Sequence, residues 1–257
     1  MPIDCEVKDH VALITLNRPE RLNALDSEHY HLLSQAWMRV RDDKDIRVAI
    51  VTGAGDKSFS TGADLKSFAN RPAPLSEMWL TQRDQLLNRG LEVWKPVIAA
   101  VNGYCLGGGM TLLLGTDIRL SVPHATFGLS EVKRGFIAGN GGTQRILKQL
   151  PYAIAMEVLL TGDPITAEAA ERWGLINKVV PADKLLDSAF AYAKRIAANG
   201  PLAIQAAKEL AIRAEDMDLP TGLRVEQMWN RMLRFSEDAM EGPKAFAEKR
   251  PARFKGE

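Results

Sequence analysis

One carboxylate in this sequence has surroundings that suit acid–base chemistry. Glu131 lies in the segment 125–145, where apolar residues and a run of glycines surround it. Desolvation raises the pKa of a carboxylate toward the range in which it can accept and donate protons near neutral pH. The same residue could instead cap a helix or pair with Lys133, Arg134 or Arg145. The segment alone leaves both roles open.

A second feature is the triplet Gly107-Gly108-Gly109, which follows a turn at Asn102-Gly103 and opens an apolar helix. Glycines at a helix start cost about 0.5 to 1 kcal/mol each, so a structural reason must favour them. The free N–H groups of a helix N-terminus suit a phosphate, a carboxylate or a developing oxyanion. Tight packing of the helix on its strand would also need glycines, so both explanations stand.

A third loop, 59–66, follows a buried strand and could open a helix, with Ala63 and Asp64 near its first residues. The sequence lacks the motifs of several other kinds of binding or catalytic site. The loop 53–58 has Asp56 where a phosphate-binding loop needs glycine, and neither a dinucleotide fingerprint nor a serine-hydrolase elbow occurs. The four histidines show no metal-ligand spacing, so we expect no metal site.

The composition is that of an ordinary soluble protein. The chain has 257 residues, a net charge of +1, 46% hydrophobic residues and 25% charged residues. Near-neutral charge without a basic stripe argues against a nucleic-acid partner, and no apolar run is long enough to span a membrane. With only Cys5 and Cys105 and no signal-peptide core, a cytoplasmic location is expected.

Strands and helices alternate in the first half of the chain, which predicts an α/β fold with parallel strand pairing through crossover connections. Hydrophobic periodicity predicts strands at 11–16, 47–52, 97–101, 117–122, 126–127 and 177–180. It predicts helices at 26–41, 75–94, 143–160, 167–173, 183–198, 202–215 and 221–235. We divide the chain into a core, 1–198, and a helical C-terminal region, 199–257.

Together these stretches resemble the crotonase superfamily, the enoyl-CoA hydratase and isomerase family. The loops 59–65 and 102–109 are similar to its two oxyanion loops, and 127–131 with 141–145 is similar to its catalytic-carboxylate segment. Further similar segments are 17–19, 22–25, 160–162, 169–177, 236–242 and 245–250. The resemblance therefore covers essentially the whole chain in order.

The resemblance implies a strand-strand-helix spiral core that binds acyl-CoA. It also implies a helical C-terminal region that covers the active site and builds a homotrimer or a dimer of trimers. The backbone N–H groups of Ala63 and Gly108 would hold the thioester oxygen, and Glu131 would be the acid–base residue. Coenzyme A belongs to the substrate, so no separate cofactor is expected. By the same resemblance, the adenine and pantetheine path would be lined by Arg21, Leu22, Thr61, Asp64 and Leu65.

One position departs from the family pattern. Two-carboxylate hydratases carry a glutamate two residues after the third glycine, where this chain has Thr111. Threonine can hydrogen-bond a water molecule but cannot act as a base near neutral pH. A single glutamate can shuttle a proton between C2 and C4, or can support hydration and dehydration if another group, such as Asn140, positions water.

The sequence leaves several functions open. They are double-bond isomerisation, hydration or dehydration, another crotonase reaction such as decarboxylation or thioester hydrolysis, and a non-catalytic CoA-binding role. An RNA-binding member is disfavoured by the neutral charge, and a protease of the same spiral fold by missing serine and histidine residues. The sequence does not identify the acyl chain of the substrate. Five large side chains are expected to pack in the core rather than line its pocket: Met78, Trp79, Trp94, Phe136 and Trp229.

Overall fold

The computed structural model describes residues 1–68 and 84–257, and within them the strands form two sheets. The larger sheet has the order β1-β2-β3-β5-β7-β10 and the smaller one β4-β6-β8-β9. Strands of the larger sheet are β1 (Ile3–Lys8), β2 (Val11–Leu16), β3 (Val48–Gly53), β5 (Val97–Val101), β7 (Ile118–Ser121) and β10 (Lys178–Val179). Those of the smaller sheet are β4 (Ser58–Ser60), β6 (Tyr104–Leu106), β8 (Thr126–Gly128) and β9 (Ile165–Thr166).

The helices of the first two hundred residues surround these sheets. They are α1 (Ser27–Asp42), α2 (Leu65–Phe68), α3 (Gly108–Leu113), α4 (Gly142–Gln149), α5 (Tyr152–Thr161), α6 (Ala167–Arg172) and α7 (Leu185–Ala197). Short 3-10 turns include η1 (Pro19–Arg21) and η3 (Glu131–Arg134). No helix among the described residues is long and apolar enough to cross a lipid bilayer.

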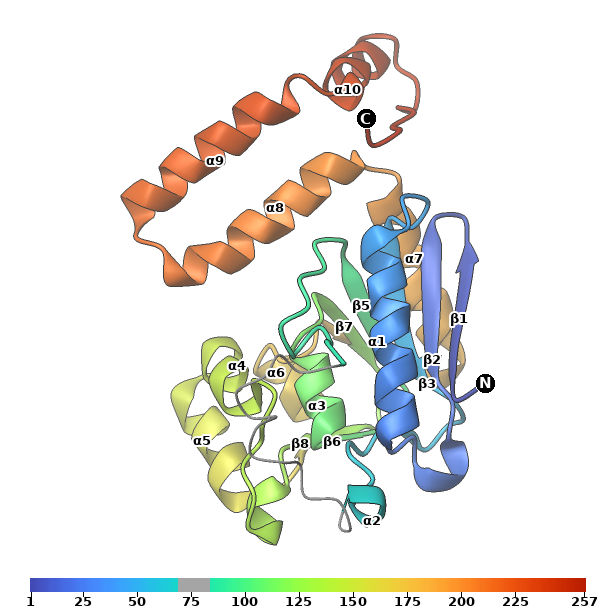
Figure 1. Ribbon diagram of the computed structural model, residues 1–257, viewed down its shortest axis with the longest axis vertical. Helices are drawn as coiled ribbons and strands as arrows, with labels where there is room; N and C mark the ends of the chain where they lie inside the picture. Colours follow the sequence, from blue (N-terminus) through green and yellow to red (C-terminus); the bar gives the residue numbers. More distant parts are fainter. Residues whose placement is uncertain (69–83) are drawn as a thin grey trace.

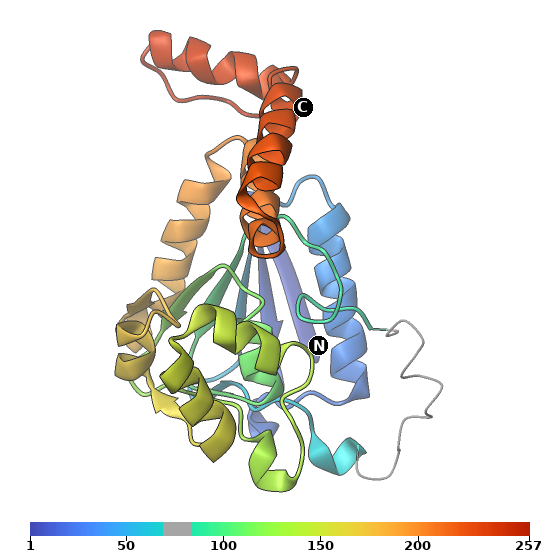
Figure 2. The same ribbon diagram turned by 90° about the vertical axis from the view of Figure 1, so that its left-hand side faces the viewer.

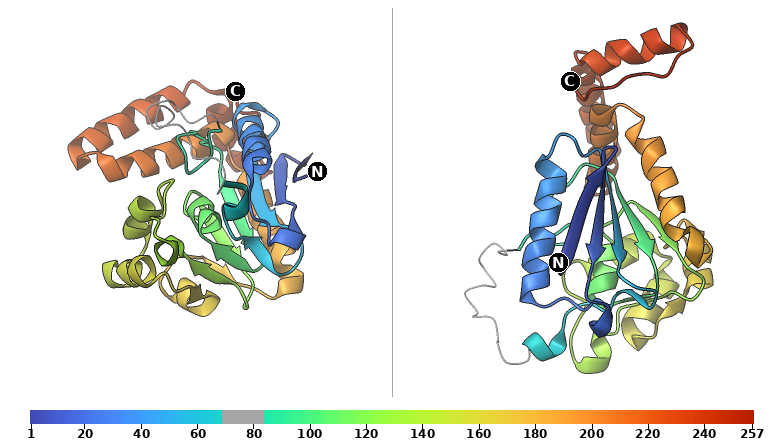
Figure 3. Two further views of the ribbon diagram at one scale, coloured as in Figure 1. Left: turned by 60° about the horizontal axis from the view of Figure 1, so that its bottom comes forward. Right: turned by 90° about the vertical axis from the view of Figure 1, so that its right-hand side faces the viewer.

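The larger sheet is covered on both faces. β3 and β5 are buried along their whole length, as expected for runs of valine, isoleucine and alanine in a parallel sheet. Helices α1 and α7 lie on opposite faces of this sheet (Figure 2 and the right-hand view of Figure 3). From β2 to β10 the neighbouring strands are parallel, and only β1 pairs antiparallel.

A strand-strand-helix unit recurs along the core. β3 leads into β4 and α2, β5 into β6 and α3, and β7 into β8 and η3. Because β4, β6 and β8 are parallel neighbours, the segments that follow them emerge at one edge of the smaller sheet. Asn102 secures the junction: its amide donates to the carbonyls of Gly53 and Gly55, both at 2.8 Å, and accepts from Gly53 N. This edge carries the candidate site.

The C-terminal helices α8 (Pro201–Arg213), α9 (Leu219–Leu233) and α10 (Glu237–Ala247) extend away from the sheets (Figure 1). Arg47, at the start of β3, ties this region to the core. Its guanidinium donates to the carbonyls of Ala197 and Phe254 at 3.0 and 2.7 Å.

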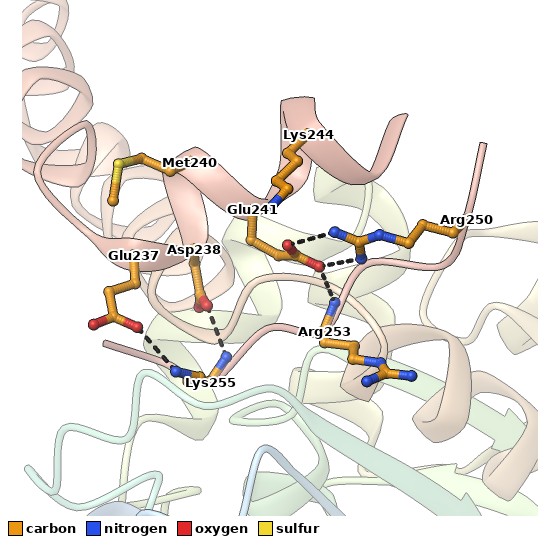
Figure 4. Close-up of a pocket in the computed structure, with 8 residues that line it drawn as sticks. All are labelled: Glu237, Asp238, Met240, Glu241, Lys244, Arg250, Arg253 and Lys255. Carbon is orange, nitrogen blue, oxygen red and sulfur yellow. Dashed lines mark hydrogen bonds and ion pairs between the residues drawn. The ribbon is translucent and has the colours of Figure 1, made fainter. Parts of the chain in front are cut away.

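A pocket beside α10 is lined mainly by charged side chains (Figure 4). Glu241 accepts two hydrogen bonds from Arg250, at 2.6 and 2.9 Å, and one from Arg253 N, and the bond from Arg250 lowers its pKa to about 2. Asp238 accepts from the backbone N–H of Lys255 at 2.7 Å. These contacts fix the C-terminal tail against α10, so we assign the pocket a structural role.

The fold confirms the predicted α/β class and the helical C-terminal region, with three corrections. The predicted helix 143–160 is two helices, because Pro151 cannot continue the first. Residues 84–94 form no helix: the Leu86 carbonyl closes a tight turn by accepting from Arg89 N and Leu91 N. The remainder of the predicted helix 75–94 lies outside the described residues, as do Met78 and Trp79.

The third correction concerns the large side chains expected in the core. Phe136 is 61% exposed, so it does not pack in the core. Trp94 and Trp229 are half-buried and line an apolar pocket between α8 and α9. Elements that the periodicity did not predict are β1, β4, β6, β9 and α10.

Candidate active site

Two backbone loops meet at the edge of the smaller sheet. Gly62 adopts φ of +86°, and a Cβ on it would lie 2.3 Å from Gly108 N. A Cβ on Gly108 would in turn lie 3.1 Å from Gly62 Cα and 3.4 Å from Ala63 N. The structure therefore brings the backbone nitrogens of Ala63 and Gly108 together, and only glycine at 62 permits this approach.

Hydrogen bonds to the segment after η1 hold the first loop in place. Leu25 N donates to the Gly62 carbonyl at 2.8 Å, and Asp64 N donates to the Leu25 carbonyl at 2.9 Å. The buried Ser60 hydroxyl donates to the Asn23 carbonyl and accepts from Gly62 N. The chain around Ala63 is thus fixed on both sides.

Arg18 reinforces the same loop electrostatically. Its guanidinium lies 3.0 Å from Asp64 Oδ2 and 3.3 Å from Asp26 Oδ2, and all three side chains are largely buried. Asp64 also accepts from Lys66 N at 3.1 Å. Burial opposes ionisation of Asp64, but these hydrogen bonds hold its pKa below the usual range. Its carboxylate therefore orders the loop.

Glu131 reaches the second loop from the start of η3. Its Oε1 lies 3.5 Å from the position of a Cβ on Gly107, the residue that precedes Gly108. Its Oε2 is buried and has no hydrogen-bond partner within residues 1–68 and 84–257. Burial raises the pKa of Glu131, with a backbone hydrogen bond and Arg134 opposing the shift. A shift in this direction moves the pKa of a carboxylate toward the range that suits acid–base chemistry.

The three cations considered as partners of Glu131 bond elsewhere. Lys133 pairs with Asp163, and Arg134 donates to the carbonyl and hydroxyl of Ser130. Arg145 donates to the carbonyls of Asn88 and Asn140, both at 3.3 Å. Within the described chain, no salt bridge to Glu131 forms.

Thr111, in the first turn of α3, is buried, and its hydroxyl is engaged within the protein. It donates to the Gly108 carbonyl at 2.9 Å and accepts from Asn88 Nδ2 at 3.0 Å. A Cβ on Gly142 would lie 2.9 Å from Thr111 Cγ2, so the loop 138–142 packs against this threonine. The loop includes Asn140, which is half-buried.

The residues predicted to line the CoA path also lie near one another. Thr61 donates from its N–H and its hydroxyl to the Leu22 carbonyl, at 3.2 and 3.3 Å. Leu22 is 36% exposed, Leu65 is 50% exposed and Arg21 lies on the surface at the end of η1. They form an open rim beside the loop that carries Ala63.

Sequence reasoning missed two residues of this site. Asn88 comes from the segment that was predicted as helix, and it holds Thr111. Tyr30 comes from α1, within the predicted helix 26–41, and its hydroxyl lies 3.2 Å from the position of a Cβ on Gly108. The hydroxyl group of a tyrosine within a predicted helix was the signal that could have identified it.

The chain is similar to proteins of one known family. Residues 6–257 match the family model described as enoyl-CoA hydratase/isomerase. The chain is 45% identical over 256 residues to the (E)-benzylidenesuccinyl-CoA hydratase of Thauera aromatica, covering 100% of both chains. It is 42% identical to the carnitinyl-CoA dehydratase of Salmonella arizonae, covering 95% of this chain and 94% of that protein.

A solved structure gives the same result. The enoyl-CoA hydratase of Bacillus anthracis superposes with a TM-score of 0.93 at 35% identity, covering 100% of both chains. The fold is thus the crotonase fold, and the protein is an enzyme of that superfamily. More narrowly, the chain belongs to the enoyl-CoA hydratase/isomerase family.

The close approach of the two loops predicts the effect of Gly62→Ala. The added Cβ would meet Gly108 N at 2.3 Å and force the two N–H groups apart. We expect turnover of an acyl-CoA substrate to fall by at least about a hundredfold, the typical effect of losing one oxyanion donor. Steady-state kinetics on the purified variant would measure this.

Gly174→Ala is the matched control. Gly174 also has a positive φ, +77°, but a Cβ there meets no described atom within 4 Å. Both variants carry backbone strain of about 1 to 3 kcal/mol, so both should melt at lower temperature. Only Gly62→Ala should lose activity; wild-type kcat/KM in that variant would contradict the assignment of the site.

Proposed function

We propose that this enzyme hydrates a 2-enoyl-CoA, or dehydrates the corresponding 3-hydroxyacyl-CoA, with Glu131 as its acid–base residue. The observation that carries the proposal is the buried Glu131 oxygen, which has no hydrogen-bond partner among the described residues, close to the loop of Gly107 and Gly108. The relatives are named for a hydratase and a dehydratase activity, which favours this reaction over others of the family.

In the proposed mechanism, the N–H groups of Ala63 and Gly108 donate to the thioester oxygen. This draws electrons from the conjugated double bond and makes C3 electrophilic. Water adds at C3 while the Glu131 carboxylate takes a proton from the water and delivers one to C2. The hydroxyl therefore ends on C3, the proton on C2, and Glu131 returns to its ionised form. Enolate charge on the oxygen is stabilised by the donors.

Two further elements complete the proposal. Asn140 positions the water, since it lies on the loop that packs on Thr111. Arg21, Leu22, Thr61 and Leu65 line the CoA path, with Asp64 ordering their loop. CoA enters as part of the substrate and no separate cofactor is used, so dialysis against a chelator should leave turnover unchanged. Two free cysteines fit the reducing cytoplasm proposed as its location.

A second candidate, double-bond isomerisation, is favoured by Thr111. Its hydroxyl already bonds the Gly108 carbonyl and Asn88, and it cannot serve as a base. Glu131 alone could move a proton between C2 and C4 of an enoyl-CoA without adding water. This reaction uses the same oxyanion donors, so the two candidates differ only in whether water enters.

A substrate panel distinguishes the candidates. Purified enzyme is incubated with 2-enoyl-, 3-enoyl- and 3-hydroxyacyl-CoA, and products are identified by mass spectrometry. We expect interconversion of the 2-enoyl and 3-hydroxy compounds, with a mass change of one water. Conversion of 3-enoyl to 2-enoyl without water uptake would select the isomerase, and tight binding without any conversion would reject both.

Glu131→Gln tests the acid–base role. Glutamine keeps the shape but cannot transfer the proton, so turnover should fall by about a hundredfold to ten-thousandfold. Glu168→Gln on the surface of α6 is the control and should keep wild-type rates. Full activity of Glu131→Gln would remove the residue from the mechanism.

The raised pKa of Glu131 also predicts a pH dependence. Because catalysis begins with the carboxylate, the rate should fall with acidification at a pH above the ordinary glutamate value of about 4.3. The folded chain holds this proton more tightly than the unfolded chain does. Protonation of Glu131 therefore stabilises the folded chain, and this stabilisation is lost as pH rises through the raised pKa. Melting curves of Glu131→Gln should not show this loss.

We further propose a homotrimer, or a dimer of trimers, built through the C-terminal helices, which would also cover the active site. Seven large apolar side chains on or near α9 and α10 are at least half exposed: Leu219, Leu223, Met228, Met232, Phe235, Met240 and Phe246. A patch of this kind marks an interaction surface. It continues past the apolar pocket between α8 and α9.

Sedimentation equilibrium tests the assembly. We expect a mass of three or six chains, and a lower mass for Phe235→Glu, because a charge would replace a side chain that is 90% exposed on the single chain. Met38→Glu on α1, at 36% exposure, is the control that should keep the assembly. A monomeric wild-type protein would reject the proposal.

A further inference from the structure

A ring of contacts closes around the side chain of Thr111. On one side, Asn88 Nδ2 donates to the Thr111 hydroxyl at 3.0 Å. On the other, the Thr111 methyl carbon lies 2.9 Å from the point that a Cβ on Gly142 would occupy. Arg145, in α4, joins the two sides, because its Nη1 donates to the carbonyls of Asn88 and Asn140, both at 3.3 Å. A single guanidinium nitrogen thus links the segment of Asn88 to the loop 138–142.

The backbone of this loop depends on Arg145. Asn140 has φ of +53° and Gly141 has φ of +83°, so two consecutive residues are left-handed, a conformation that residues with a side chain rarely adopt. A Cβ on Gly141 would lie 1.9 Å from Arg145 Nη1, which shows that the guanidinium fills the space beside this glycine. Arg145 N also donates to the Gly141 carbonyl at 2.8 Å. Arg145 therefore holds the loop with both its main chain and its side chain.

Asn88 carries a hydrogen-bond acceptor that no described residue uses. The residue is 6% exposed, and its Oδ1 accepts no hydrogen bond within residues 1–68 and 84–257. Its Nδ2 is engaged by Thr111, whose own proton goes to the Gly108 carbonyl. Glu131 Oε2 is a second buried acceptor in the same state. Buried polar atoms of this kind cost free energy unless a water molecule or a ligand donates to them.

We infer that Arg145 is a positioning residue for water addition, which holds Asn88 and the loop of Asn140 in the arrangement that binds the attacking water. The inference rests on the proposed function, in which Asn140 positions that water. Arg145 touches no reacting atom in this scheme and acts through the two backbone carbonyls. A planar guanidinium with several fixed donors suits the bridging of two acceptors better than the ammonium group of lysine does.

The step that Arg145 serves is separable from proton transfer at C2. Water addition needs a water molecule held at C3, and a displacement of about 1 Å can cost about a hundredfold in rate. Proton transfer at C2 needs Glu131 and the two backbone donors, and the contact between Gly62 and Gly108 sets the position of those donors. Loss of the Arg145 bridge should therefore slow water addition and leave the chemistry at C2 in place.

Arg145→Met tests the inference, because methionine fills a similar space without any donor. One readout is hydration of the 2-enoyl-CoA that the wild type converts fastest. The other is exchange of the C2 protons of the saturated acyl-CoA of the same chain length with deuterium oxide, which involves no water addition. We expect kcat for hydration to fall by about tenfold to a hundredfold, with KM and C2 exchange near wild-type values. Arg145→Lys should recover part of the lost rate.

A second variant and a matched control separate this role from general loosening of the fold. Gly141→Ala displaces the guanidinium, because the added Cβ lies 1.9 Å from Nη1, and it should reproduce the selective loss of hydration. Arg213→Met is the control. Arg213 also ties the segment of Asn88 to a helix, since it pairs with Glu92 at 3.3 Å and lies over the Trp94 ring, 5.1 Å from its centroid. This variant should keep wild-type hydration and exchange.

Distinct outcomes overturn the inference and the proposed function. If Arg145→Met loses hydration and C2 exchange to the same extent, Arg145 supports the whole site and is not specific to water addition. If both rates stay at wild-type values, Arg145 has no role in the reaction. In both cases the proposed hydration still stands. If the wild type exchanges C2 protons but adds water to no 2-enoyl-CoA, the proposed hydration fails and the inference fails with it.

Discussion

The contact between Gly62 and Gly108 is the constraint on which the site depends. Two backbones from different strand-strand-helix units approach so closely that neither residue has room for a Cβ without displacing its neighbour. The parallel order of β4, β6 and β8 sets this approach, and the hydrogen bonds of Leu25, Ser60 and the Arg18 ion pairs maintain it. Preorganised donors of this kind need no rearrangement during the reaction.

Glu131 depends on the same constraint for its chemistry. The second loop and the start of η3 enclose its carboxylate and leave one oxygen without a partner in the described structure. The neighbouring cations could have neutralised it, but each is held by another group: Lys133 by Asp163, Arg145 by two backbone carbonyls. A salt bridge would have lowered the pKa of Glu131, so these alternative contacts favour the acid–base role proposed for it.

The sequence predicted what depends on local patterns. Apolar runs identified β3 and β5, and the glycine loops with Glu131 identified the family. It did not predict β4, β6 and β9, strands of two or three residues that are held by pairing with strands far along the chain. The sequence did not identify Tyr30 as a site residue, because the spacing of apolar residues along a helix shows which face is buried but not where the tyrosine hydroxyl lies. Thr111 was placed correctly on the helix, yet its bond to Asn88 joins residues 23 positions apart.

The glycine triplet has a consequence for how such enzymes diverge. Gly107 adopts φ of +53°, Gly108 faces Gly62, and a Cβ on Gly109 would lie 2.2 Å from the Ser60 carbonyl oxygen, so none of the three tolerates a side chain. The side chain at position 111, two residues later, is accommodated: its hydroxyl bonds Asn88 Nδ2 and the Gly108 carbonyl, and its methyl group faces Gly142. A substitution at 111 can therefore leave the backbone of the helix start unchanged. Under the proposed function, one such substitution would alter the groups that meet the substrate and keep both backbone donors in place.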